Sequence, residues 1–477
     1  MPFPSVDIIV RRIDLRELPN LFSRIIDLKP DPRGGGYFAL ASVDGSVFGA
    51  SPGYVLLFDD AHNLRQAWAF SLQHESEPGH TIVHAAAMDV GPAGIFIAGT
   101  IIVQRGPLPN YVFVAKFSLD GRREGVRVYV PNLVDGCRYP YAFHSTGRGI
   151  GRLPAPDDDK LMVLFQTTVL SNGFTDPPAD DSAGAGVFLI GDDLSEKSLV
   201  TRLFCRGHFV ATRLRVLPKH GPTIVGKTRR LPGAERWQPA WMRVDPDGNP
   251  VEQLAYDLGT DAVLNDVAAH GDDMLAVGEF EPPHPSPHSA LAMRMAADGS
   301  STRWIAEYAK HPQLEHLTLG LTTLAAFDDQ FIAGGWQNPG GNSGPWLVRL
   351  DPSAPPPVWH KWYQPLASSA LNNTCSALLF NQPNRVIGGG STSRNTVHEQ
   401  KPVIDREPLL FVSETEPGIE LPVCSTVLPI DVQIPDARPR PGTPWLDRMR
   451  IFPREWIQTS EMVEPEVRTI CPDPTPP

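Results

Sequence analysis

The chain has 477 residues, including 50 prolines and 41 glycines, so about a fifth of it consists of residues that interrupt helices and favour turns. A hydrophobic fraction of 41% with 20% charged residues is ordinary for a folded protein and excludes wholesale disorder. The chain has 42 Lys and Arg against 54 Asp and Glu. Its net charge of −12 argues against nucleic acid or an anionic membrane as the partner, because both are polyanions.

The N-terminal segment, residues 1–18, mixes charged residues with short apolar runs and lacks the continuous apolar core of a secretory signal. No apolar run elsewhere approaches the roughly 18 residues that a membrane helix needs. The expected location is therefore the cytoplasm, or the outside of the cell if the protein is exported within a larger particle.

One sequence unit recurs along the chain between Gly36 and Pro417. It consists of a short apolar run ending in glycine, a polar loop, a second apolar run with a basic residue near its end, and, in three of the four clearest copies, Asp-Gly. Three degenerate copies bring the total to seven units, about 52 to 66 residues apart. In the four clearest copies the glycine and the basic residue are 15 to 17 positions apart, at Gly99 and Lys116, Gly226 and Arg243, Gly278 and Arg294, and Gly334 and Arg349.

Each unit contains four short segments rich in β-branched and aromatic residues, bounded by turn residues, and this pattern predicts four antiparallel strands. Repeats of this size with four strands pack radially as the blades of a propeller. The predicted fold is therefore all-β, a seven-bladed β-propeller over residues 1–420 followed by a Pro-rich irregular extension over residues 421–477. The glycine that ends the second strand would admit the backbone of a neighbouring blade where the blades crowd near the axis.

The unit from Gly94 to Val130 resembles the bacterial β-propeller repeats of the SBBP and delta-60 type, with Tyr111–Gly121 as the best match. The resemblance extends over most of the chain, from Gly36 to Pro417. It implies the propeller fold and no shared set of catalytic residues.

Two segments lie outside the repeats. An apolar, β-rich stretch near the N-terminus, Asp7–Ile13, is predicted to close the ring by pairing with the last blade near Leu409–Ser413. The extension is rich in proline and carries large apolar side chains, so it either wraps its own propeller or anchors on a protein partner. Trp445, Phe452 and Trp456 are the candidate partner-binding residues.

The five cysteines have no zinc-ribbon spacing and read as buried free thiols. A bridge between Cys424 and Cys471 stays open as an alternative.

Histidines recur near the start of several predicted innermost strands, which would line the axial channel. They are His80 and His84, His144, His208 and His316. Imidazoles from different blades suit Zn, Cu or Fe. His80, His144, His208 and His316 are therefore the candidate metal ligands, with no other cofactor indicated.

Three functional hypotheses follow. The first is a non-catalytic scaffold that docks to a protein partner or a larger assembly through its loops and its tail. The alternative is a metal-dependent enzyme, an oxidoreductase or lyase, with the axial histidines at the channel mouth. A third hypothesis is carbohydrate binding through Trp237, Trp336 and Trp346, because aromatic faces stack on sugars.

Overall fold

The computed structural model describes residues 10–14, 22–44, 52–73, 81–103, 110–133, 143–169, 183–195, 200–204, 209–229, 236–282, 287–296, 301–310, 317–339, 343–363, 374–383, 385–398, 401–414, 425–426, 430–433, 438–441, 446–454, 457–462 and 466–471. Within these ranges there is no helix of the length and apolar character needed to cross a membrane.

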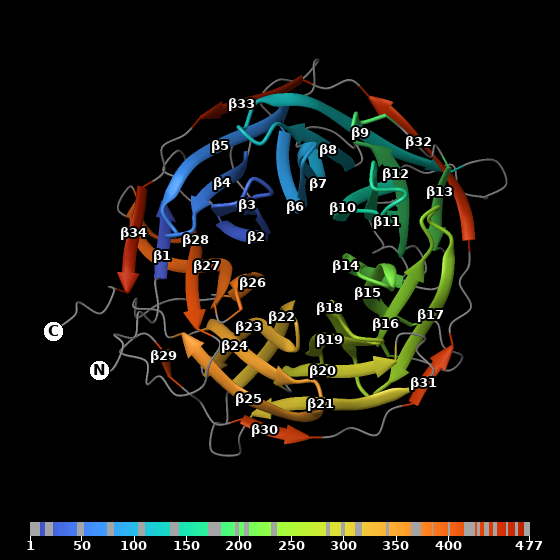
Figure 1. The fold of residues 1–477 in the computed structure, drawn as a ribbon, viewed down its shortest axis with the longest axis vertical. Coiled ribbons are helices and arrows are strands. Elements are labelled where there is room, and N and C mark those ends of the chain that lie inside the picture. The colour runs from blue at the N-terminus through green and yellow to red at the C-terminus, as the bar shows by residue number, and fades with distance from the viewer. Residues whose placement is uncertain are drawn as a thin grey trace.

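Seven blades stand around a central axis, each with four strands ordered from the axis outward (Figure 1). The all-β, seven-bladed propeller predicted from the repeats is confirmed. Blades 1 to 3 are β2 (Phe22–Pro30), β3 (Gly36–Asp44), β4 (Gly53–Asp59) and β5 (Leu64–Gln73); β6 (Thr81–Gly91), β7 (Gly94–Val103), β8 (Tyr111–Phe117) and β9 (Arg123–Leu133); β10 (Phe143–Arg152), β11 (Lys160–Val169), β12 (Ala183–Gly191) and β13 (Val200–Phe204). Blades 4 to 6 are β14 (Phe209–Leu217), β15 (Gly221–Thr228), β16 (Gln238–Val244) and β17 (Pro250–Asp257); β18 (Ala262–His270), β19 (Asp273–Phe280), β20 (Ser289–Ala296) and β21 (Thr302–Lys310); β22 (Leu317–Phe327), β23 (Gln330–Pro339), β24 (Gly344–Asp351) and β25 (Ala354–Tyr363). Blade 7 is β26 (Thr374–Gln382), β27 (Arg385–His398), β28 (Lys401–Glu414) and β1 (Val10–Asp14).

The middle strands of each blade are nearly continuous apolar runs because neighbouring blades cover both of their faces. In β8, Lys116 is the one side chain that is not fully buried. Its ammonium lies 5.6 Å from the centre of the Phe96 ring, so the basic residue of the repeat lies along the blade face. The interface between blades 1 and 2 buries, among others, Phe38, Trp68, Val83 and Phe113.

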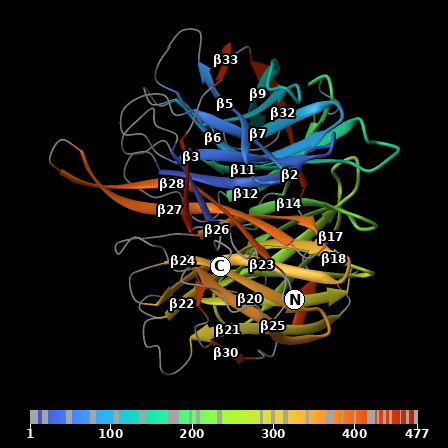
Figure 2. The same ribbon diagram turned by 60° about the vertical axis from the view of Figure 1, so that its left-hand side comes forward.

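Blade 7 takes its fourth strand from the N-terminus. β1 is antiparallel to β28, with Val10 opposite Phe411 and Arg12 opposite Leu409. Ile13 is completely buried in an apolar cluster shared by blades 1 and 7. The ring is thus closed by strands from the two ends of the repeat region. The long hairpin of β27 and β28 stands out from one face of the disc (Figure 2).

Short segments of the C-terminal extension pair with the outermost strands of the blades (Figure 1). They visit the blades in reverse order and end on β1. An outer edge is the place in a sheet where proline is tolerated, because one side of the strand needs no hydrogen-bond donors. These strands are β29 (Ser425–Thr426), β30 (Ile430–Gln433), β31 (Arg438–Pro441), β32 (Leu446–Arg454), β33 (Ile457–Met462) and β34 (Glu466–Cys471).

All seven innermost strands contain a β-bulge at the same point of their pairing with the second strand. A bulge leaves one residue unpaired and changes the direction of nearby side chains. The unpaired residues are Ile26, Ala86, Arg148, Thr212, Asn265, Thr322 and Ser376.

The glycines of the repeat face these bulges. A Cβ at each of five of them would lie between 1.7 and 2.2 Å from a carbonyl oxygen of the innermost strand of the same blade. The backbone that requires glycine is therefore that of the same blade, and the prediction of a neighbouring blade was wrong on this point. Gly335, rather than Gly334, takes this place in blade 6. The five are Gly99, Gly226, Gly278, Gly335 and Gly390.

Candidate functional site

A cavity of about 390 Å³ lies among the innermost strands and is lined by residues from every blade except blade 5. Its charged or titratable lining residues are Arg24, His84, Arg148 and Arg213, and no carboxylate occurs among the described residues that line it. Several hydroxyl groups complete the wall, from Thr100, Thr146, Thr212, Thr322, Thr374 and Ser376.

Hydrogen bonds between bulge residues join blades 4 to 7 around the axis. Thr212 Oγ1 donates to the carbonyl of Leu264 at 2.6 Å, and Asn265 Nδ2 donates to the carbonyl of Leu321 at 2.8 Å. Thr322 Oγ1 donates in the same way to the carbonyl of Cys375. Each acceptor is the residue before the bulge of the next blade. A small polar side chain at the bulge therefore links two blades.

Blades 1 to 3 depart from this pattern, since their bulge residues are Ile26, Ala86 and Arg148. The first two side chains have no polar atoms, and the third is too long to repeat the short link. The cavity is lined most heavily from these three blades. The site thus occupies the sector in which the described ring of hydrogen bonds is interrupted.

Arg148 is the central side chain of the site. It lies between Gly147 and Gly149 on β10, and a Cβ at Gly149 would lie 2.9 Å from Leu214, so the strand is packed tightly while the arginine projects to the axis. Within the described part of the chain, its guanidinium makes no hydrogen bond or salt bridge. Partial desolvation, and then the positive charge of Arg24, lower its pKa.

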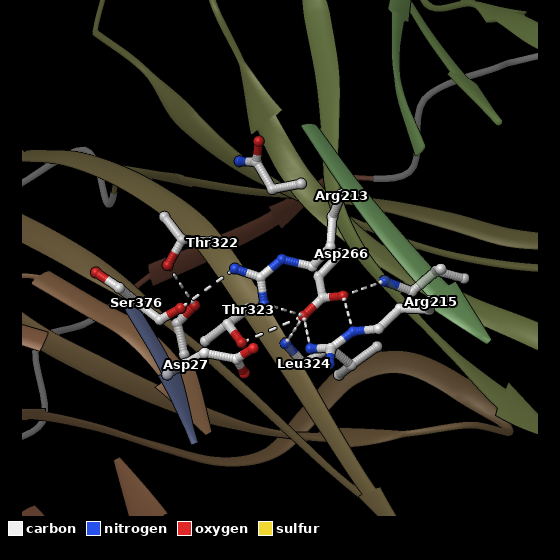
Figure 3. Close-up of polar contacts among 12 residues, drawn as sticks. Asp27, Arg213, Arg215, Asp266, Thr322, Thr323, Leu324 and Ser376 are labelled. Atoms are coloured by element: carbon white, nitrogen blue, oxygen red, sulfur yellow. Dashed lines mark hydrogen bonds and ion pairs between the residues drawn. The ribbon is translucent and has the colours of Figure 1, made fainter. Parts of the chain in front are cut away.

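The Arg213 guanidinium, by contrast, is neutralised by Asp266, which does not line the cavity. The side chain of Asp266 is completely buried, and its Oδ2 lies 3.3 Å from Arg213 Nη1 and 2.6 Å from Arg215 Nη2 (Figure 3). Burial would raise the pKa of Asp266, but the two guanidiniums outweigh burial and lower it to about 2. Arg213 also donates to the carbonyl of Ser376, at 3.4 Å.

A second cavity of about 230 Å³ adjoins the first and shares Arg148, Thr212 and Arg213 with it. Its charges include both signs. Lys29 lies 3.9 Å from Asp27, and Arg152 lies 3.4 Å from Asp89, whose pKa is raised by burial. The second cavity therefore also has more cationic than anionic groups, but its lining includes carboxylates, whereas the described lining of the first cavity includes none.

Of the four predicted metal ligands, only His144 lies within the described residues. His80, His208 and His316 lie outside the described residues, and His144 is placed by its backbone alone, in β10 opposite Thr168. Across the described ranges, no group of three or more His, Cys, Asp and Glu side chains is placed to hold a metal ion. The alternative of a metal-dependent enzyme with Zn, Cu or Fe therefore gains no support.

Most of the predicted partner-binding residues of the tail also lie outside the described residues. Trp445 and Trp456 lie outside the described residues, and Phe452 is placed by its backbone within β32, so partner binding by these residues stays a prediction.

The predicted sugar-stacking surface is not formed as a set. Trp346 is completely buried in blade 6 and cannot stack on a sugar. Trp237 is covered by Arg229, whose guanidinium carbon lies 4.4 Å from the ring centre.

Sequence reasoning recognised His84 as a channel residue but missed Arg24 and Arg148. Both stand in innermost strands, and Arg148 interrupts the glycine-rich run Gly147–Gly151. In the structure, Arg24 and His84 occupy the same position, two residues before the bulge, and Arg148 is itself a bulge residue. The apolar spacing of the sequence does not mark the bulges, so it gave no signal that aligned these residues.

Comparison with known proteins gives a fold likeness without a family. No protein-family model and no curated protein matches the chain. Among solved structures, it is similar to the phage phi92 endosialidase, with a TM-score of 0.47 and 8% identity over 89% of this chain and 72% of that chain. At this identity the likeness concerns the fold alone.

The expectation of a non-catalytic scaffold that docks through its tail is corrected. A fold does not determine a function, so a propeller without recognisable catalytic motifs is no ground for excluding catalysis. The described segments of the tail also pair with the chain's own blades, which occupies the edges that docking would use.

Proposed function

We propose that the protein binds a small anionic ligand in the axial cavity. The observation that carries the proposal is Arg148, a guanidinium without an acidic partner in the described structure, placed close enough to Arg24 for the two charges to repel. A bound carboxylate, sulfate or phosphate group would relieve this repulsion and accept charge-assisted hydrogen bonds. His84 and the hydroxyls of the wall add further polar contacts.

The volume of the cavity supports the same proposal. Sites for small molecules usually enclose about 300 to 1,000 Å³, with a few polar groups that orient the ligand. The cavity of about 390 Å³ lies at the lower end of that range. The separate proposal that the blades belong to the bacterial SBBP and delta-60 repeat type rests on the sequence pattern of Tyr111–Gly121.

Isothermal titration calorimetry with sulfate, phosphate and acetate tests the proposed binding. Arg148→Gln is expected to weaken binding about 10- to 100-fold, because a hydrogen bond to a charged group contributes about 1.5–3 kcal/mol. Arg122→Gln is the matched control, since Arg122 is exposed in a turn outside the cavity. The proposal fails if no anion binds the parent at about 10 mM, or if both variants lose affinity equally.

A further inference from the structure

We infer that the ligand carries hydroxyl groups as well as its anionic group, as a hydroxylated carboxylate or phosphate does. This inference rests on the proposed anion binding and adds the chemistry of the rest of the ligand. It follows from counting which hydrogen-bond donors and acceptors the cavity wall has left.

Four hydroxyls of the wall have their single hydrogen directed to a backbone carbonyl. Thr212 donates to Leu264, and Thr322 donates to Cys375. Thr374 also donates to Cys375, at 3.4 Å, and Thr146 donates to Gln166 at 3.5 Å. A hydroxyl has one hydrogen and two acceptor lone pairs. Toward the cavity these four groups can therefore only accept.

Three of the four acceptors come from blades that hold neither Arg24 nor Arg148. These two guanidiniums belong to blades 1 and 3, whereas Thr212, Thr322 and Thr374 belong to blades 4, 6 and 7. The fourth acceptor, Thr146, shares blade 3 with Arg148, and the guanidinium of Arg213 on blade 4 is paired with Asp266. A bare inorganic anion would satisfy the cations and leave the opposite wall to water. A ligand with hydroxyl donors at its other end would satisfy both walls.

The apolar part of the lining fits the same ligand. Ile26, Ala85, Ala86 and Ile102 line the cavity from blades 1 and 2. They present a limited apolar surface against which the C–H groups of a polyol can pack. A long apolar anion would instead bury the hydroxyls of Thr212 and Thr322 without donors, which weakens binding.

The test compares ligands that differ in a single feature on the unmodified protein. Gluconate is expected to bind at least about tenfold more tightly than hexanoate, which has the same carbon chain without hydroxyls, because each hydrogen bond adds a few-fold in affinity. Glucose 6-phosphate is likewise expected to bind more tightly than inorganic phosphate. Glucitol, which has hydroxyls and no charge, is expected to bind far more weakly than gluconate. The carboxylate and phosphate pairs show which anionic group the site prefers.

The outcomes separate this inference from the proposed function. If hexanoate and phosphate bind as tightly as their hydroxylated counterparts, recognition of hydroxyls is wrong and anion binding stands. If no anion binds, the proposed function itself fails.

A variant pair locates the acceptors. Thr212→Val is expected to weaken gluconate about threefold to tenfold and to leave hexanoate unchanged. Thr318→Val is the control, because Thr318 lies on β22 outside the cavity lining. Equal losses for both ligands, or the same loss in the control, would place the effect outside hydroxyl recognition. The ligand series decides the question if Thr212→Val does not fold.

Discussion

Replacing Asp266 with asparagine is expected to lower the free energy of unfolding by about 3–5 kcal/mol, the usual cost of leaving a buried charge without its partner. The carboxylate is completely buried and accepts hydrogen bonds from the side chain of Arg215 at 2.6 and 2.7 Å. It also accepts backbone N–H groups from Val267 and Leu324, both at 2.9 Å. Because Arg215 lies in blade 4 and Leu324 in blade 6, this one side chain holds three blades together.

The pH dependence of stability gives an independent value for the contribution of the Asp266 carboxylate to the free energy of unfolding. The pKa of Asp266 falls from 3.8 to about 2 in the folded protein, and a difference of about 1.8 units corresponds to about 2 kcal/mol. A lowered pKa means that this stability is present above pH 4 and is lost as the pH falls toward 2. The parent should therefore lose about 2 kcal/mol more than Asp266→Asn over that interval.

Urea unfolding followed by tryptophan fluorescence measures both effects. Asp272→Asn is the matched control on the same blade, because the Asp272 side chain is 95% exposed, and its loss should stay below about 0.5 kcal/mol. A loss below about 1 kcal/mol in Asp266→Asn would refute the reasoning. It would show that the Asp266 carboxylate is replaceable by a neutral acceptor.

Three further predictions concern single residues. Gly278→Ala is expected to lower the free energy of unfolding by about 1–3 kcal/mol, because its Cβ would lie 1.9 Å from the carbonyl oxygen of Val263. Urea titrations measure this loss, and an unchanged midpoint of the unfolding transition would contradict the bulge explanation. Burial lowers the pKa of His360 from 6.5 to about 4, so the free energy of unfolding should fall by up to about 3 kcal/mol as the pH drops from 6.5 to 4. In thermal unfolding measured across this pH range, His360→Phe should remove that pH dependence. The Cys375 thiol is completely buried and its pKa is raised, so a thiol reagent should modify it only after denaturation. Mass spectrometry counts the adducts on the parent and on Cys375→Ser. If the native parent carried one adduct more than the native variant, the prediction would be wrong.

The blades could be predicted from the sequence because each is built from local features. Four apolar segments and their turns fall within one repeat, and covered strands require apolar residues whichever blade they belong to. The spacing from Gly99 to Lys116 recurs because both residues belong to one sheet. The same reasoning failed for the role of the glycine, since a bulge is a register shift and leaves no mark on apolar spacing.

The candidate site could not be predicted in the same way. Arg24, His84 and Arg148 stand about 60 residues apart in the chain and meet only when the ring closes. A bulge displaces the side chains by one position, so alternation along the strand does not tell which of them face the axis. The emphasis on histidines identified His84 and passed over the arginines beside it.

The sequence by itself determined the repeat, the strand content and the number of blades, because these depend on short-range patterns that each unit carries independently. Only the tertiary structure decided that Asp266 neutralises Arg213 while Arg148 keeps its charge unbalanced among the described residues. The physical reason is that charge balance depends on distance through space between different blades. Composition records how many charges the chain has, and the closed ring decides which of them meet.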